Sequence, residues 1–500
     1  MFNICLATTH IGMDKQATEL RYAVRFRVVF KYFGQLSLVL AALTTVPLSV
    51  SLYFGEQAVS AAYAVVIGGL VILGAGLAGL RRPAGIQANE GMVLVALMFV
   101  FSPLVMTYPL MLSSGLGFLD AFFEAVSGIT TTGLSTKATL AGASATFLFA
   151  RAWMQWYGAL GIVVLSLALV MRPGLVSKGL AVSQTWEDDL IGGTRAHARR
   201  IVEVYGLMTV IGVIGAMLAG IRSFEALLYT MAGVSTGGFA PYDSSLAALD
   251  WPGQIWVILL CLAGAMPLSL YYRAVRPNRQ LLAVDLIQVR AIVVAAVIVT
   301  LLLGTGLWLE GRPWAEIRQH APLLAFSAQT TAGFSSLPPG QLKAGSKLVL
   351  IFAMLAGGGI GSTAGGFKLL RLLIAGSVLR LILVRTCVPR HAIVEPRLAG
   401  RPLREEDIQE ALLLILVFVS VVTVSWLFFV MMGYAPLDSL FEVVSATGTV
   451  GLSVGMTSST LPPLLKGVLC ADMLMGRLEI IAWLVLLYPG TWFGRRMEVV

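Results

Sequence analysis

The sequence predicts an all-α polytopic membrane protein with about ten transmembrane helices, and three observations support this fold class. Of its 500 residues, 57% are hydrophobic and only 12% are charged, so polar side chains are too few to cover a water-soluble surface of this size. Apolar segments of about 20 residues, long enough to cross about 30 Å of hydrocarbon, recur along nearly the whole chain. Most of the 35 Lys and Arg residues fall in alternate connecting segments, as the positive-inside rule requires.

The apolar segments give the predicted spans in order. They lie at 32–53, 60–80, 91–112, 148–171, 201–221, 253–272, 288–309, 346–386, 409–433 and 467–489. The span 346–386 is interrupted by the glycine-rich stretch GGGIGSTAGGFK at 357–368. We expect one polytopic domain with no sizeable soluble domain attached.

The distribution of positive charge predicts the orientation of the chain. With the N-terminus in the cytoplasm, most basic residues lie in cytoplasmic segments, and both termini are then cytoplasmic. This sorting accounts for the formal net charge of +9 without a polyanionic ligand. We therefore expect the lipid bilayer as a partner and no nucleic acid.

A repeat appears in the segments on the opposite side of the membrane. Four times, an apolar span is followed by a short amphipathic segment, a small-residue tetrad and another span. The tetrads all read T-x-G-[F/L], and they are Thr131-Thr132-Gly133-Leu134, Thr236-Gly237-Gly238-Phe239, Thr331-Ala332-Gly333-Phe334 and Thr449-Val450-Gly451-Leu452. One T-x-G is typical of an ordinary turn, but four copies at the same place in a span pair indicate a repeated structural unit.

The segment before each tetrad predicts a short re-entrant helix. These segments are LDAFFEAVSGIT, FEALLYTMAGVS, HAPLLAFSAQT and LDSLFEVVSATG, and each is too short to span a bilayer. The residues 13 positions before the tetrad glycines are Asp120, Glu225, His320 and Asp438. An acid here can stabilise the helix N-terminus by capping and through the helix dipole, or it can concentrate cations at an outer vestibule. The sequence is compatible with both roles.

Four such units have one natural arrangement, a pseudo-fourfold ring around one pore. Irregular backbone at membrane depth is tolerated where it lines a cavity or is buried in protein, and small residues let successive carbonyl groups face the axis. Such carbonyls can replace the water around a monovalent cation, whereas no ring of four carboxylates is present to hold a divalent ion. We predict a cytoplasmic N-terminus (1–31), an extra two-span hairpin (32–85) and four pore units (90–175, 200–280, 285–390 and 405–495).

These features resemble the Trk/Ktr/HKT superfamily of potassium-uptake proteins, in which one chain carries four fused channel-like units. The resemblance covers residues 30 to 495 and includes the strings MQWYGALGIVVL (154–165), STGGFAPYD (235–243), TTAGFSS (330–336) and MLMGRLEI (473–480). The two spans before the first unit and the MQWYG string are similar to the Trk branch. The fourth filter, Thr449-Val450-Gly451, resembles the Ktr branch instead.

The resemblance implies potassium as the transported ion and no cofactor on this chain. In the superfamily, glycine at the filter position of all four units accompanies potassium selectivity, and those positions here are Gly133, Gly238, Gly333 and Gly451. It also implies a homodimer in the bacterial inner membrane that docks a cytoplasmic ring of nucleotide-binding regulatory subunits. The basic loops 172–200 and 386–408 are candidate contacts, although solvated loops that obey the positive-inside rule have the same composition.

The glycine stretch has two soluble-protein interpretations, and both fail on their own chemistry. A phosphate loop requires G-x-x-x-x-G-K-[ST], but Phe367 follows Gly366 and moves Lys368 one place too far. A dinucleotide fingerprint requires an acid about 20 residues further on, where the chain has VLRL. We predict instead a flexible intramembrane loop below the filter that obstructs or clears the ion path, as in the superfamily. The predicted gate residues are Gly357, Gly358, Gly359, Gly361, Ser362, Thr363, Gly365, Gly366, Lys368 and Arg477.

Two of these gate residues are basic. Arg477 costs about 2.5–3.5 kcal/mol or more at mid-membrane depth unless it is paired or hydrated. It can pair with Glu479, snorkel to the end of its span, or interact with the glycine loop or the filter carbonyls. In the superfamily the matching arginine lies near the permeation path under the filter. Lys368 either snorkels to the cytoplasmic side or acts with the gate.

The remaining alternatives concern the class of function. A membrane transferase is weakly supported because His10, His197, His320 and His391 are scattered, so we do not predict an enzyme. Within transport, gated conduction, sodium- or proton-coupled symport and a sodium-permeable mode stay open. No buried acid relay stands out in the sequence, which favours gated conduction.

Overall fold

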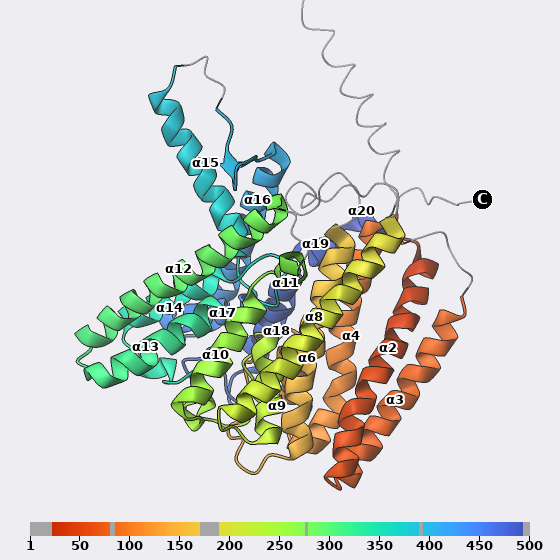
Figure 1. The fold of residues 1–500 in the computed structure, drawn as a ribbon. Helices are drawn as coiled ribbons and strands as arrows, with labels where there is room; N and C mark the ends of the chain where they lie inside the picture. Colours follow the sequence, from red (N-terminus) through yellow and green to blue (C-terminus); the bar gives the residue numbers. More distant parts are fainter. Residues whose placement is uncertain (1–22, 81–85, 171–189, 276–278, 390–393, 494–500) are drawn as a thin grey trace, which may run out of the picture.

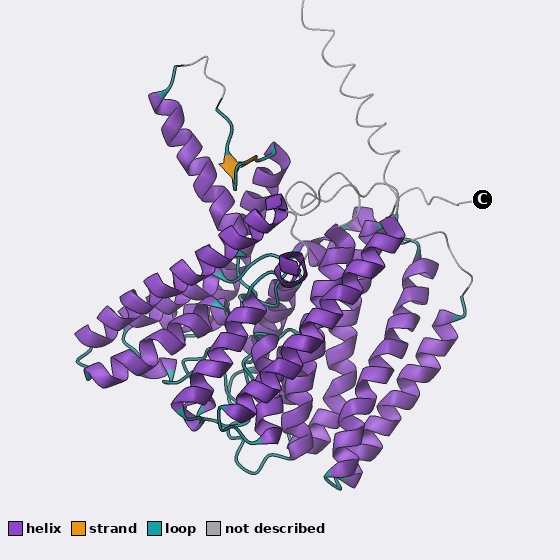
Figure 2. Ribbon diagram, viewed as in Figure 1, coloured by secondary structure: helices purple, strands orange, loops and turns teal. Residues whose placement is uncertain are grey.

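The computed structural model describes residues 23–80, 86–170, 190–275, 279–389 and 394–493 (Figure 1). The predicted cytoplasmic chain ends, most of the 172–200 loop and part of the 386–408 loop lie outside these residues. The described chain is almost entirely helical, with one small antiparallel pair formed by β1 (Arg397–Leu398) and β2 (Arg401–Pro402), as Figure 2 shows. The predicted all-α fold is confirmed.

Several of the described helices can cross a membrane by length and composition. Six pass this test, and a bent helix pair would be a seventh. The six are α2 (Phe26–Tyr53), α3 (Gln57–Ala78), α4 (Ala88–Ser114), the stretch Ala198–Leu218 of α8 (Leu190–Leu218), the stretch Ala283–Leu309 of α12 (Arg279–Leu309), and α16 (Glu405–Met431). The chain is therefore polytopic, as its composition predicts.

The helices α2 and α3 form the predicted N-terminal hairpin. They approach closely because glycines face each other: an ideal Cβ on Gly34 would lie 2.8 Å from the backbone nitrogen of Ala78. One on Gly74 would lie 2.9 Å from the carbonyl oxygen of Gly34. The hairpin packs on α4 and on α6 (Ala145–Val170), so it supports the outside of the first unit.

Each of the four units consists of a first span, a short helix and a second span. The first spans are α4, α8, α12 and α16. The short helices are α5 (Phe118–Ile129), α9 (Ser223–Val234), α13 (Trp314–Gln329) and α17 (Pro436–Thr447). The second spans are α6, α10 (Trp251–Ala265) with α11 (Leu268–Val275), α14 (Ala344–Ala356) with α15 (Leu369–Cys387), and α18 (Pro463–Arg477) with α19 (Ile481–Leu487). The short elements η1 (Ser245–Ala248), η2 (Pro339–Gln341) and α20 (Pro489–Trp492) complete the described chain.

The four units close into a cycle. Within each unit the short helix packs against both spans, and the second span of each unit also packs against the short helix of the next. These contacts between units join α6 to α9, α10 to α13, α14 to α17 and α18 to α5. Because the last unit returns to the first, the short helices surround a common axis, as the repeat in the sequence predicts.

Two spans predicted as continuous are broken. The span 253–272 is bent by 86° between α10 and α11 at Met266–Pro267, where proline removes a helical donor. The span 467–489 is broken after Arg477, where Glu479 and Ile480 adopt positive φ angles of 56° and 64°. Hydropathy identified the length of the apolar segment in both cases, but it carries no information about where the chain changes direction within that segment.

The breaks follow glycines that pack on the ends of the short helices. An ideal Cβ on Gly264 would lie 2.4 Å from the carbonyl oxygen of Val234, and one on Gly476 would lie 1.8 Å from that of Thr447. Gly158 of the first unit makes the same approach, 2.1 Å from the carbonyl oxygen of Ile129. Glycine at this level therefore allows a second span to touch the base of its own short helix.

The third short helix is longer than predicted. It begins at Trp314, so His320 lies inside it and the acid of its first turn is Glu316. The predicted segment HAPLLAFSAQT does not include the beginning of this helix, because Arg318 and Gln319 interrupt the apolar pattern there.

Candidate functional site: the T-x-G ring and the glycine loop

Each short helix ends in the same backbone motif. In the first unit, the N–H of Thr131 donates to the carbonyl of Gly128 (3.0 Å) and that of Thr132 to the carbonyl of Ser127 (2.9 Å). This is the Schellman pattern, which requires a left-handed residue just after the helix. The corresponding pairs of N–H donors in the other three units make the same bonds. The left-handed residue is threonine in all four units, with φ of 56°, 50°, 54° and 48° at Thr131, Thr236, Thr331 and Thr449.

The third residue of each tetrad touches the next unit. An ideal Cβ on Gly133 would lie 2.3 Å from the carbonyl oxygen of Gly237, and one on Gly238 would lie 2.4 Å from that of Ala332. Gly333 and Gly451 make the same approach, 2.0 Å each, to the carbonyl oxygens of Val450 and Thr132. Each unit thus contacts the next one in sequence order, and the fourth unit contacts the first. All twelve predicted filter residues are therefore brought into a single closed ring.

The first two residues of each tetrad have satisfied backbone donors and, except for Gly237, carbonyl oxygens that accept no hydrogen bond within the described chain. Their N–H groups bond back to the short helices, as described above. Within the described chain, no hydrogen bond reaches the carbonyl oxygens of Thr131, Thr132, Thr236, Thr331, Ala332, Thr449 and Val450. Their residues are buried, whereas the glycine of each tetrad is partly accessible. Buried carbonyls without a hydrogen-bond donor are uncommon in proteins. Their repetition in four units therefore indicates a functional site.

Buried glutamates hold the chain just after the tetrad in units one and four. The Glu124 Oε1 atom accepts from Thr136 N (3.0 Å) and from the Ser135 hydroxyl. The Glu442 Oε1 atom accepts from Val454 N and Met456 N, both at 3.1 Å. Sequence reasoning missed both glutamates, although the shared pattern E-x-V-S in LDAFFEAVSG and LDSLFEVVSA could have identified them.

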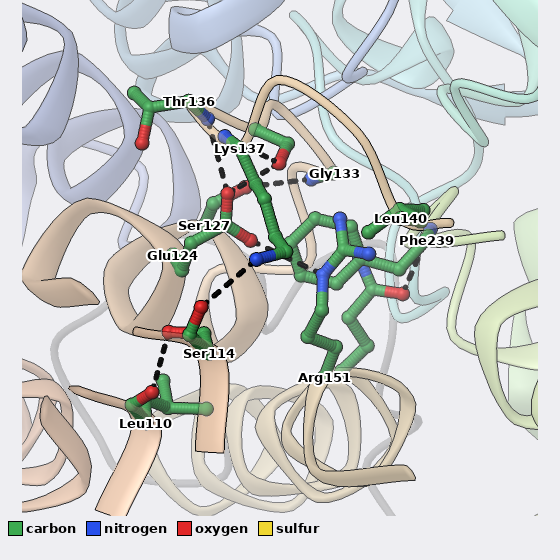
Figure 3. Close-up of polar contacts among 12 residues, drawn as sticks. Leu110, Ser114, Glu124, Ser127, Gly133, Thr136, Lys137, Leu140, Arg151 and Phe239 are labelled. Carbon is green, nitrogen blue, oxygen red and sulfur yellow. Dashed lines mark hydrogen bonds and ion pairs between the residues drawn. The ribbon is translucent and has the colours of Figure 1, made fainter. Parts of the chain in front are cut away.

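The serines of the same pattern support the filter glycines. Ser127 Oγ accepts from Gly133 N, and Ser445 Oγ accepts from Gly451 N, both at 3.0 Å. We call each of these sets a bracket: the glutamate and the serine of one short helix, together with the backbone groups that donate to them. Figure 3 shows Ser127, Gly133, Glu124 and Thr136 of the first bracket.

The second unit is held differently. Gln155 of α6 donates to the carbonyl of Gly237 and accepts from Phe239 N (3.2 Å), so it supports the second tetrad from the first unit. The Tyr229 hydroxyl, at the position of the glutamates, donates to the carbonyl of Ser245 (2.8 Å). Gln155 lies in the MQWYG string but was not singled out from the sequence.

The four residues that stand 13 positions before the tetrad glycines are engaged by neighbours. Asp120 pairs with Lys466 at 2.5 Å, and Asp438 pairs with Lys347 at 2.6 Å. Glu225 accepts from the Tyr242 hydroxyl, and this hydrogen bond raises the pKa of Tyr242. His320 Nδ1 lies 3.1 Å from Ser336 Oγ. None of these helices has a side-chain cap at its N-cap residue, so the acids act through the helix dipole and these pairs.

The glycine loop 357–368 lies against three of the four tetrads. Gly365 N donates to Thr331 Oγ1 (2.7 Å), and Gly366 N donates to the carbonyl of Gly448 (3.1 Å). The Thr363 hydroxyl donates toward the carbonyls of Val234 and Gly264 (3.0 and 2.9 Å), and the Thr236 hydroxyl donates to it (3.3 Å). The loop therefore meets the tetrad threonines on the side where the short helices end.

Glycine is required at several places in this loop. Gly357, Gly361 and Gly366 have positive φ angles of 68°, 73° and 73°. A Cβ on Gly365 would lie 2.1 Å from the carbonyl oxygen of Gly448, and one on Gly358 would lie 3.0 Å from that of Ala265. The loop is thus packed backbone against backbone.

The loop is also tied to helices of the second and third units. Gly359 N and Thr363 N donate to the carbonyls of Ala265 and Gly264, and the carbonyl of Gly361 accepts from Leu268 N. Gln329 at the end of α13 donates to the carbonyl of Gly357 (2.8 Å), and Gln288 of α12 accepts from Ile360 N (2.9 Å). These two glutamines were also missed, because an isolated Gln in an apolar run gives no recognisable signal.

The two basic residues predicted for the gate, Lys368 and Arg477, contact backbone carbonyls of the loop. Arg477 donates to the carbonyl of Thr363 (2.7 Å) and is buried, whereas Glu479 pairs with Arg371. The proposed pairing of Arg477 with Glu479 is therefore wrong. Lys368 is buried and donates to the carbonyl of Ala364, so it does not snorkel to an aqueous surface. In the described part of the chain, no group of three or more His, Cys, Asp or Glu residues could hold a metal ion.

Comparison with known proteins agrees with this architecture. The Trk system potassium uptake protein TrkI of Halomonas elongata is 29% identical over 484 residues, which cover 94% of this chain and 97% of the relative. An uncharacterized cation transporter of Methanocaldococcus jannaschii is 28% identical over 466 residues, which cover 92% of this chain and 94% of the relative.

A solved structure shows the same fold. The crystal structure of the potassium transporter TrkH from Vibrio parahaemolyticus matches with a TM-score of 0.82 at 23% identity, over 94% of this chain and 100% of that one. A family model for TrkH, described as a cation transport protein, matches residues 70–489. Because this match covers far more than half of the sequence, the chain belongs to the TrkH family of cation transport proteins and is not an enzyme.

Proposed function

We propose that this chain is the membrane subunit of a Trk-type potassium uptake system and that K⁺ crosses the membrane along the axis of the T-x-G ring. One observation carries the proposal. Four tetrads form a closed ring in which seven buried backbone carbonyls accept no hydrogen bond from the described part of the chain. Oxygens arranged in this way can replace the hydration shell of a dehydrated cation.

Two further features favour a cation on this axis. The short helices end at the ring, so the negative ends of four helix dipoles meet there. The buried hydroxyl oxygens of Thr131 and Thr449 have no hydrogen-bond partner in the described chain. They add neutral oxygen ligands at the inner end of the ring.

The ligands favour a monovalent ion. Divalent cations are held by carboxylates in addition to neutral oxygens. Here Glu124 and Glu442 accept hydrogen bonds from their own post-filter segments, and Asp120 and Asp438 are paired with lysines. The relatives named as potassium uptake proteins support K⁺ as the ion carried.

The glycine loop is the gate of this path in our proposal. It is hydrogen-bonded to Thr236 through Thr363 and to Thr331 through Gly365, directly at the inner end of the ring. Arg477 holds its middle through the Thr363 carbonyl. Conduction then requires these bonds to break and the loop to move off the axis.

We further propose the cellular setting that the family implies. The chain lies in the plasma membrane of a bacterium with both termini in the cytoplasm and assembles as a homodimer. A cytoplasmic ring of nucleotide-binding subunits regulates the gate. The positive-inside charge distribution and the relatives' designation as parts of a Trk system support this setting.

The test is rubidium uptake by proteoliposomes that contain the purified chain. A membrane voltage alone should drive uptake, and potassium should compete more strongly than sodium. Uptake that stops when sodium and pH gradients are removed would contradict conduction and indicate symport. Complete absence of uptake in the presence of all gradients would contradict transport by the chain alone.

Proton coupling is a second candidate because of one buried acid that the sequence did not bring forward. Asp472 of α18 is fully buried and accepts from the Ser425 hydroxyl (2.6 Å), and its second oxygen has no hydrogen-bond partner among the described residues. Intramembrane acids of this kind serve proton transfer in transporters. Asp472→Asn should leave voltage-driven uptake intact under the conduction proposal, whereas it should abolish any acceleration by a pH gradient under the symport alternative.

A further inference from the structure

We propose that Glu442 determines the cation affinity of the filter: its buried negative charge strengthens cation binding, and the charge of the matching Glu124 is cancelled by Arg151. This inference rests on the ion path proposed above. It concerns residues outside the T-x-G tetrads that lie behind the filter.

The surroundings of Glu442 fit an ionised carboxylate. Its side chain is fully buried. Beside the two backbone N–H groups on Oε1, the Ser453 hydroxyl donates to Oε1 (2.5 Å) and the Thr457 hydroxyl donates to Oε2 (3.0 Å). Hydrogen bonds donated to a carboxylate favour its charged form and so oppose the cost of burying the charge. All four donors come from the segment that directly follows Gly451, so the charge is fixed beside the filter.

No cation neutralises this charge. Within the described chain, no Lys, Arg or His nitrogen lies within 4.0 Å of the Glu442 carboxylate, since the ion pairs of this region are made by other acids. Asp438, one turn earlier in α17, is the acid that engages Lys347. Glu442 is therefore compensated by neutral donors alone.

Glu124 occupies the same position in α5 but has a cationic partner. Arg151 Nε of α6 lies 3.1 Å from Glu124 Oε2, and the side-chain exposures are only 4% and 0%. The guanidinium carbon also lies 3.8 Å from the ring centroid of Phe239, the last residue of the second tetrad. Figure 3 shows Arg151 between Glu124 and Phe239. This partner makes the first bracket electrically neutral.

The ring is consequently asymmetric in charge. The second and third units carry Tyr229 and Leu324 at the matching position, the first carries a neutral ion pair, and the fourth carries an uncompensated anion. A unit charge about 10 Å from the ion, at an effective dielectric constant of about 20, changes cation affinity on the order of tenfold. The affinity of the filter thus depends on one glutamate and not on a symmetric set.

The experiment compares the KM for rubidium uptake in variants that change this charge. Glu442→Gln keeps an oxygen acceptor for the two N–H groups and removes the charge, so KM should rise on the order of tenfold with a smaller effect on maximal rate. Ser453→Ala is the matched control, because it removes one hydrogen bond of the bracket and keeps the charge. It should lower the maximal rate without the rise in KM.

Arg151 supplies a test of opposite sign. Arg151→Met keeps apolar contact with Phe239 and leaves the charge of Glu124 uncompensated, so KM should fall below the wild-type value. The double variant Glu124→Gln with Arg151→Met restores a neutral first bracket, so its KM should return to near the wild-type value. If these charged residues had only a structural role, every variant would show a higher KM or a lower maximal rate.

The outcomes separate the two proposals. An unchanged KM in Glu442→Gln, or equal KM changes in Glu442→Gln and Ser453→Ala, would overturn the role of this charge. If Arg151→Met is not recovered as a monodisperse protein, the double variant and the comparison of Glu442→Gln with Ser453→Ala decide the question. Failure of the wild-type protein to take up rubidium at all would instead overturn the proposed ion path.

Discussion

Threonine occupies a left-handed backbone position in each tetrad, where helices usually end in glycine or asparagine. This conformation costs a β-branched residue about 1–3 kcal/mol, and it persists only where the surroundings impose it. Here the Schellman hydrogen bonds before it and the tightly packed glycine after it impose it four times. Strain repeated at the same place favours a role for the threonine hydroxyl that glycine could not supply. The unpartnered hydroxyls of Thr131 and Thr449 fit such a role.

Gly133→Ser tests the filter at the scale of one residue. Its Cβ would meet the carbonyl oxygen of Gly237 at 2.3 Å, so one carbonyl of the ring must move. We expect reduced discrimination, with sodium uptake becoming measurable beside rubidium uptake.

The matched control for this substitution is Gly142→Ser. Gly142 also has a positive φ of 75° but no neighbouring atom within 4 Å of an added Cβ. Both variants carry the same backbone strain, and only the first disturbs the ring. Unchanged selectivity in Gly133→Ser would count against the filter assignment.

At the scale of elements, the break between α14 and α15 joins the proposed gate to the rest of the molecule. The loop is bonded to the α10–α11 bend, to α12 through Gln288 and to α18 through Arg477. It also contacts the filter threonines. A movement of any of these helices therefore reaches the filter through hydrogen bonds to backbone groups.

Thr363→Val tests how firmly the loop is held. The substitution keeps the shape of the side chain and removes the donor to Val234 and Gly264, which weakens the closed state by about 1–3 kcal/mol. We expect faster voltage-driven rubidium uptake. Thr300→Val in α12 is the control, because Thr300 only bonds to Ala296 of its own helix.

Arg477→Gln should act in the same direction and more strongly. Its bond to the carbonyl of Thr363 is a charge-assisted hydrogen bond, worth about 1.5–3 kcal/mol. Open probability in single-channel or flux recordings should rise. A lower rate with unchanged protein yield would mean that the arginine supports conduction and does not hold the gate.

Shortening the loop within Gly357–Gly366 is the coarser test of the same element. Removal of part of it should raise flux and weaken regulation by the cytoplasmic subunits. Because its backbone is bonded to Gly264, Ala265 and Gly448, loss of folding is the competing result. That result would identify the loop as a packing device.

At the scale of the whole molecule, ion pairs fasten the fourth unit to both of its neighbours. Lys466 of α18 reaches Asp120 of α5, 346 residues away, and Lys347 of α14 reaches Asp438 of α17. The lysines are 5% and 11% exposed, so these pairs are much less screened than surface pairs. They close the cycle of units in the same places where the helices pack.

Lys466→Met and Asp120→Asn should each lower the thermal stability of the detergent-solubilised protein. Loss of one partner of such a pair costs about 1–3 kcal/mol, and the double variant should lose less than the sum. Arg199→Met provides the control, because the Arg199–Glu203 pair is 82% and 59% exposed and contributes about 0–0.5 kcal/mol. Additive losses would show that the two side chains are not energetically coupled.

The repeated units could be predicted because their signals are local. Hydropathy identified the apolar segments, and the four T-x-G tetrads identified the ring, since each depends on residues close together in sequence. The breaks at Pro267 and after Arg477 were not predicted, because the direction of the chain within an apolar segment depends on how that segment packs against other helices, such as the short helix of its own unit. Glu124, Glu442 and Gln155 were missed because a polar residue in a helix reveals its partner only in three dimensions.

The sequence by itself determined the membrane fold, the four units and the positions where the backbone must be glycine. The tertiary structure decided which charges are cancelled: Arg151 joins Glu124, Lys466 joins Asp120, and Glu442 is left with neutral donors. It also decided that Arg477 binds the glycine loop and that Glu479 binds Arg371. The physical reason is that the electrostatic energy of a buried charge depends on atoms within a few ångströms, and the cycle of units brings those atoms from distant parts of the chain.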